Sequence, residues 1–124
     1  MPKKVMVIDD EPDMIFMLKS ILEKNGYEVM SAGDGLTALH LLRTQAPDLF
    51  IVDLTMPGMS GWQFNMKLRQ DPRFKTTPVI VLSGLIERDS KPEKFELASA
   101  YMVKPFDIFT LLEKVKELLG ETNK

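Results

Sequence analysis

Residues 48–58 read DLFIVDLTMPG, in which four consecutive apolar residues lead directly into a carboxylate at Asp53. An uninterrupted apolar run of this length, β-branched at Ile51 and Val52, is typical of a strand buried on both faces of a parallel sheet. The pair Pro57-Gly58 then indicates a turn. We therefore expect Asp53 at the carboxyl end of a central strand, which is the edge where open α/β sheets bind ligands.

Further strands are expected on either side of this stretch. Their ranges are 5–8, 29–32, 79–82 and 101–103, and the intervening helices are expected at about 12–25, 35–45, 60–70, 88–99 and 107–118. The helix at 88–99 is the weakest of these expectations, because Pro92 lies inside it. Strands that alternate with helices predict the α/β class, as a three-layer sandwich with helices on both faces of a five-stranded parallel sheet.

The composition is that of an ordinary globular domain, and we expect one domain over residues 1–124. A net charge of -2 provides no basic field for nucleic acid, and the absence of cysteine excludes disulfides and thiolate metal sites. The apolar run near the N-terminus is too short for a signal peptide or a membrane span. We therefore expect a cytoplasmic protein that binds neither nucleic acid nor membrane.

Polar side chains follow four of the expected strands, and parallel strands would bring them to one edge of the sheet. They are Asp9 and Asp10, Asp53, Ser83, and Lys104. With the strand order 2-1-3-4-5, Asp10 and Asp53 would be neighbours across the switch point of the sheet. Clustered carboxylates repel one another, and Mg²⁺, which prefers oxygen ligands, would relieve the repulsion. A metal, an ammonium and a hydroxyl are the groups that stabilise phosphoryl transfer, with Asp53 as the acceptor.

Four segments of the chain resemble the response-regulator receiver family of two-component signalling, in the family's order and with similar spacings. They read VIDDEP at 7–12, VDLTMPGMSG at 52–61, VLSG at 81–84 and YMVKPF at 101–106. The resemblance implies the flavodoxin-like receiver fold with Asp53 as the phosphoacceptor. It implies that Mg²⁺ is held by Asp9, Asp10, Asp53 and the backbone carbonyl of Thr55. It further implies that Lys104 contacts the phosphoryl group, that Ser83 and Tyr101 form the switch, and that the Lys104-Pro105 peptide is cis.

The resemblance also implies partners. A histidine kinase or histidine phosphotransferase would donate the phosphoryl group, and a downstream protein would bind the switched surface of the fourth helix, fifth strand and fifth helix. Onward phosphotransfer and a dimer formed on phosphorylation stay open. The run Met14-Ile15-Phe16-Met17-Leu18 is too long for one helix face to bury. We therefore predict a docking patch, made up of Met14, Ile15, Met17, Pro105 and Phe106.

The main alternative is an aspartate-nucleophile phosphatase, or a flavin- or nucleotide-binding protein on a similar sheet. A phosphatase of this type would have a second carboxylate two residues beyond the nucleophile, but the residue two positions beyond Asp53 is Thr55. The chain has no Walker-type glycine loop, and no Ser/Thr-rich flavin phosphate loop follows its first strand. The resemblance implies that Thr55 and Leu85 lie where side chains govern the approach of water to an acyl phosphate. Neither is an acid or amide that could orient a water molecule, so any acyl phosphate should be lost slowly. We expect a signalling domain that catalyses only its own phosphorylation and slow dephosphorylation.

Overall fold

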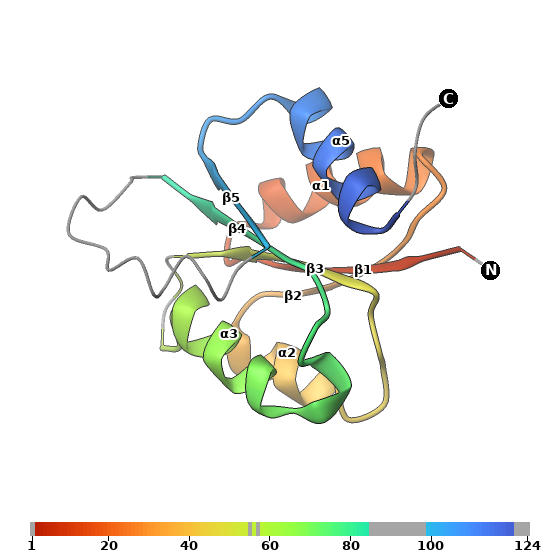
Figure 1. The fold of residues 1–124 in the computed structure, drawn as a ribbon. Helices are drawn as coiled ribbons and strands as arrows, with labels where there is room; N and C mark the ends of the chain where they lie inside the picture. The colour runs from red at the N-terminus through yellow and green to blue at the C-terminus, as the bar shows by residue number, and fades with distance from the viewer. Residues whose placement is uncertain (1, 55, 57, 85–98, 121–124) are drawn as a thin grey trace.

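Five parallel strands form the single sheet of the described structure, in the order β2-β1-β3-β4-β5 (Figure 1). This computed structural model describes residues 2–54, 56, 58–84 and 99–120. The strands are β1 (Lys4–Ile8), β2 (Glu28–Ala32), β3 (Leu49–Asp53), β4 (Val79–Ser83) and β5 (Ala100–Val103). The α/β class, the parallel sheet and the strand order predicted from the sequence are confirmed.

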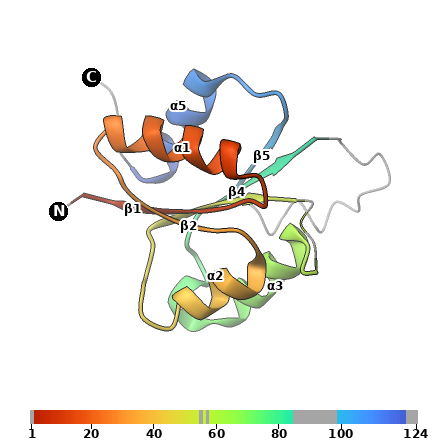
Figure 2. The same ribbon diagram turned by 180° about the vertical axis from the view of Figure 1, so that it is seen from behind.

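Helices cover both faces of the sheet. The described helices are α1 (Pro12–Lys24), α2 (Gly35–Leu41), α3 (Gly61–Gln70), the 3₁₀ helix η1 (Pro72–Phe74) and α5 (Ile108–Leu118). Figures 1 and 2 show α1 and α5 on one face and α2 and α3 on the other. The helix expected at 88–99 lies outside the described residues, apart from its last position. Among the described helices, none is both long and apolar enough to cross a bilayer.

The apolar runs of the sequence are continuous because the central strands are buried on both faces. In β3, Phe50 and Val52 join the core cluster beneath α2 and α3, whereas Leu49 and Ile51 join the cluster beneath α1 and α5. The residues of β1 and β4 alternate between the two clusters in the same way. Since successive side chains of a strand point to opposite faces, a strand between two helical layers needs an apolar residue at every position.

Local capping sets where the helices begin and end. Ser60 and Gln63 form a reciprocal capping box at the start of α3, and Asp107 accepts a hydrogen bond from the Phe109 amide at the start of α5. Helix α2 is shorter than expected, because it ends at Leu41 rather than near Gln45. Beyond Leu41, the amides of Arg43 and Thr44 donate to the carbonyls of His40 and Leu41, three residues earlier, as in a 3₁₀ turn.

Candidate functional site

The register of the sheet aligns the strand ends that carry polar side chains. Ile8 of β1 pairs with Val52 of β3, so the residues that follow them, Asp9 and Asp53, lie beside each other. Ser83 ends β4 opposite Val103 of β5, and the amide of Lys104 donates to the Ser83 carbonyl at 2.6 Å. The parallel strands therefore bring four separated parts of the chain to one edge of the sheet.

Three carboxylates form a cluster at this edge. One oxygen from each of Asp9, Asp10 and Asp53 lies within 4.8 Å of the others. Asp9 is 1% exposed and Asp53 is 5% exposed, whereas Asp10 is exposed to solvent. The ammonium of Lys104 lies 3.3 Å from Asp53 Oδ1 and 3.4 Å from Asp9 Oδ2. One cation therefore contacts two buried carboxylates, while the third faces water.

Burial and the neighbouring charges shift the pKa values of Asp9 and Lys104 in opposite directions. Burial raises the pKa of Asp9, although the Glu11 amide, which donates to Asp9 Oδ1 at 2.9 Å, and the Lys104 ammonium both favour the ionised form. Burial alone would lower the pKa of Lys104, but Asp9 and Asp53 outweigh it, and the pKa of Lys104 is raised. Lys104 thus stays charged at neutral pH, and the pocket carries an excess of negative charge.

The donor set fits a hard divalent cation. Carboxylate oxygens are the ligands that Mg²⁺ prefers, and the exposed Asp10 leaves room for the water molecules that Mg²⁺ retains. The observed cluster supplies three such oxygens and an unbalanced negative charge that a cation would neutralise. The backbone carbonyl of Thr55, a ligand that the resemblance implies, lies outside the described residues.

Gly61 holds the loop after Asp53 against the first turn of α3, which sequence reasoning did not find. Its amide donates to the Leu54 carbonyl at 2.8 Å. A Cβ atom at Gly61 would lie 2.6 Å from the Asp53 carbonyl oxygen and 2.8 Å from Leu54 Cα. Because both neighbours are backbone atoms, only glycine allows this approach. The sequence shows Gly61 only as the last residue of a motif, without a reason for it.

The two residues implied as a switch lie on neighbouring strands. The Ser83 side chain is buried at the end of β4, and Tyr101 is half-buried in β5. Tyr101 stacks on Trp62 of α3, with the ring centroids 6.3 Å apart and the planes 3° from parallel. Trp62 is the only tryptophan of the chain. The stack joins β5 to the helix that follows the Asp53 loop, and no sequence pattern indicates it.

An apolar groove adjoins Lys104 on the face of the sheet that α1 and α5 cover. This groove of about 240 Å³ is lined by Met14, Met17, Lys104, Pro105, Phe106 and Ile108. Four of the five residues predicted for docking therefore lie together, and the Lys104-Pro105 peptide beside them is cis. Ile15, the fifth predicted docking residue, is not among the lining residues. Its partly buried side chain packs against the core cluster beneath α1 and α5.

Phe16 was left out of the predicted docking patch, yet its side chain is 74% exposed. It lies two positions before the buried Leu18, which at about 100° per residue places it on the opposite side of α1. A helical projection of the apolar run would have identified it. The apolar surface of α1 thus extends beyond the groove.

Comparison with known proteins identifies relatives along almost the whole chain. The sequence model described as "Response regulator receiver domain" matches residues 5–116. Protein PilH of Pseudomonas aeruginosa is 32% identical over 118 residues, which cover 94% of this chain and 98% of PilH. The DNA-binding dual master transcriptional regulator RpaA of a Synechocystis species is 34% identical over 122 residues, or 98% of this chain. The chain spans only about half, 51%, of RpaA.

Solved structures share the fold as well as the sequence. The response regulator TrrA of Thermotoga maritima, crystallised in complex with Mg²⁺ and BeF, has a TM-score of 0.84 and 35% sequence identity. The match covers 94% of this chain and 98% of that one. The residues matched by the family model, 5–116, include the strand ends that carry the acidic cluster.

Proposed function

The chain belongs to the response regulator receiver domain family of two-component signalling, and on that premise we propose that Asp53 accepts a phosphoryl group from a histidine on a partner kinase or phosphotransferase. The observation that carries the proposal is that Asp53 lies 3.3 Å from the Lys104 ammonium and within 4.8 Å of the two other carboxylates. We further propose that residues 1–124 work as a single receiver domain.

In the proposed reaction, a carboxylate oxygen of Asp53 attacks the phosphorus of the phosphohistidine. The new oxygen–phosphorus bond forms as the nitrogen–phosphorus bond breaks, and the electron pair stays on the histidine nitrogen, which takes up a proton. The product is an acyl phosphate. The Lys104 ammonium, 3.3 Å from Asp53 Oδ1, is placed to pair with a phosphoryl oxygen. Asp9, Asp10 and Asp53 would hold Mg²⁺, which when bound neutralises charge on the transferring group.

The proposed response is a change at the neighbouring strands. A phosphoryl group brings further negative charge and strong acceptor oxygens to the end of β3. The Ser83 hydroxyl, buried on the adjacent strand, is the proposed donor that moves toward it. Tyr101 lies two residues before the Val103 that pairs with Ser83, and it contacts Trp62. The charge would therefore shift a two-state equilibrium of β5 and its surface, which a downstream protein reads.

The groove between α1 and the start of α5 is the proposed docking surface for the phosphodonor. Met14, Met17, Pro105 and Phe106 line it, and Lys104, which also lines it, reaches the acidic cluster from there. Ile15 would contribute by supporting α1 from the core side. A partner seated here could therefore present a phosphohistidine close to Asp53.

The test is incubation with Mg²⁺ and acetyl phosphate, followed by intact-protein mass spectrometry and borohydride reduction to locate an acyl phosphate. We expect one phosphoryl group per chain at Asp53, and none in Asp53→Asn or in the presence of EDTA. Glu113→Gln, the same type of change at an exposed position of α5, should label as the wild type does. Labelling that persists in Asp53→Asn, or repeated turnover of a phosphate ester, would contradict the proposal.

A further inference from the structure

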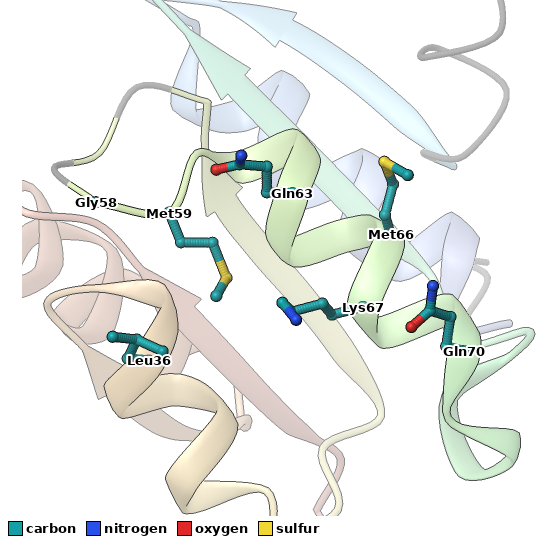
Figure 3. A pocket seen from close by; sticks show the side chains of 7 residues that line it. All are labelled: Leu36, Gly58, Met59, Gln63, Met66, Lys67 and Gln70. Carbon is teal, nitrogen blue, oxygen red and sulfur yellow. The ribbon is translucent and has the colours of Figure 1, made fainter.

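A larger groove lies between the start of α2 and the outer face of α3, on the helical layer opposite to α1 and α5 (Figure 3). Its volume is about 500 Å³, which is within the range of ligand sites. The side chains of Met59 and Lys67 reach into the space between the two helices, with Leu36 on the far side. The lining residues are Leu36, Gly58, Met59, Gln63, Met66, Lys67 and Gln70.

Two large apolar side chains that line the groove are exposed to solvent. Leu36 is 70% exposed and Met66 is 53% exposed. Within the described part of the chain, only two other large apolar side chains are more than half exposed, Phe16 on α1 and Phe109 on α5. Both line the same groove, and exposed apolar side chains at a groove mark a candidate binding site. The two grooves thus form separate apolar surfaces on opposite layers.

Lys67 is the only charged residue among the seven that line the groove. No carboxylate of the described residues forms an ion pair with it. Asp34, which lines the adjacent hollow with Leu36, is engaged instead with the Thr37 amide at 2.7 Å. An occupant that fits the groove would therefore be apolar and carry a negative charge opposite Lys67.

We propose that the α2–α3 groove is a docking site for a protein segment that presents apolar side chains and one carboxylate to Lys67. The α3 residues that line it, Gln63, Met66, Lys67 and Gln70, are spaced at three, four and seven positions. They therefore form one stripe about 10 Å long. Such a stripe suits about two turns of an amphipathic helix laid into the groove. The spacing and the single charge favour a peptide over a free anionic amphiphile.

The occupant would also touch the loop that leaves Asp53. Gly58 and Met59 belong both to this loop and to the groove, and Gly58 has a φ of +79°, which other residues rarely adopt. The proposal goes beyond phosphoryl acceptance and does not depend on it, because none of the seven lining residues belongs to the acidic cluster. Binding is therefore tested on the unphosphorylated protein, where failure of Asp53 labelling has no effect on the result.

The experiment is an NMR titration of the ¹⁵N-labelled chain with two short synthetic helical peptides. Both carry a leucine face, and they differ only in whether glutamate or lysine flanks it; sodium decanoate is the third probe. We expect the glutamate peptide to shift the amides of Leu36, Met59 and residues 63–70. We expect it to bind about tenfold more tightly than the lysine peptide, because the exchange replaces one attraction by a repulsion.

Charge reversal at the groove should reverse this preference. Lys67→Glu should bind the lysine peptide more tightly, and Lys67→Gln should bind both peptides equally. Lys19→Glu, the same change at an exposed position of α1, should keep the wild-type preference. Retained dispersion of the spectrum shows whether each variant is folded.

Four results would overturn the proposal: equal affinities of the two peptides for the wild type, an unchanged preference in both Lys67 variants, shifts confined to α1 and α5, or binding of decanoate alone.

Discussion

Asp53→Asn should stabilise the protein when no divalent cation is present. The carboxylate of Asp53 lies within 4.8 Å of those of Asp9 and Asp10 and 3.3 Å from the Lys104 ammonium. With an effective dielectric constant of about 20, each repulsion is worth about 3.5 kcal/mol and the attraction about 5 kcal/mol. The ionised Asp53 is therefore disfavoured by about 2 kcal/mol. The amide has nearly the same shape, and its carbonyl oxygen can still accept a hydrogen bond from the Lys104 ammonium.

The assay is urea denaturation of both proteins at neutral pH, in EDTA and in excess Mg²⁺. In EDTA, the variant should have a free energy of unfolding about 2 kcal/mol larger, which corresponds to roughly 4 °C in Tm per kcal/mol for a domain of this size. Mg²⁺ at ten times its Kd should stabilise the wild type by about 1.4 kcal/mol. Mg²⁺ should stabilise the variant less, because the variant has lost one anionic ligand. The difference in free energy of unfolding between the two proteins should therefore be smaller in Mg²⁺ than in EDTA.

The control is Glu113→Gln, which removes a carboxylate from the exposed face of α5. It should change the free energy of unfolding by less than about 0.5 kcal/mol in either buffer. The reasoning is refuted if Asp53→Asn destabilises the protein in EDTA, or if Mg²⁺ stabilises the wild type and the variant equally. Either result would mean that the three carboxylates do not repel one another within one negatively charged site.

Three further predictions concern the groups around the cluster. Lys104→Met should lower the free energy of unfolding in EDTA by about 2–4 kcal/mol, because two buried carboxylates lose their cation. Since the folded pKa of Lys104 is raised, its stabilising effect is complete below the usual value of 10.5 and is lost as pH rises through the higher folded value. Urea denaturation between neutral and strongly alkaline pH should therefore show a decline in the wild type that the variant lacks, and equal slopes would contradict this. Gly61→Ala should lower the free energy of unfolding by about 1–3 kcal/mol, since its Cβ atom would meet backbone atoms at 2.6 and 2.8 Å. Gly33→Ala should leave the free energy of unfolding nearly unchanged, because its Cβ atom would meet nothing within 4 Å. Comparable denaturation midpoints for these two variants would show that the close approach is not limiting. Finally, the fluorescence of Trp62 should change when Mg²⁺ and acetyl phosphate are added, because Trp62 stacks on Tyr101. Tyr101→Leu should abolish this change, and an identical response in that variant would argue against the proposed switch.

The sequence was sufficient for the sheet because the relevant signal is local. Each central strand shows a continuous apolar run, which follows from burial on both faces, and each run ends at the polar residue that leaves the sheet. Once the strands are parallel, their carboxyl ends must meet, so Asp9, Asp53 and Lys104 could be placed together before any coordinates. The functional roles of these residues stay predictions until phosphorylation is measured.

Only the tertiary structure shows the contacts and grooves that depend on how the helices pack against the sheet and against one another. The stack of Trp62 on Tyr101 and the contact of Gly61 with the Asp53 carbonyl each join elements whose separation the sequence does not encode. The α2–α3 groove likewise exists only because two helices leave space between them. Strand and helix periodicity act over a few neighbouring residues, whereas such contacts follow from the packing of the whole core, so they can be read only from the folded chain.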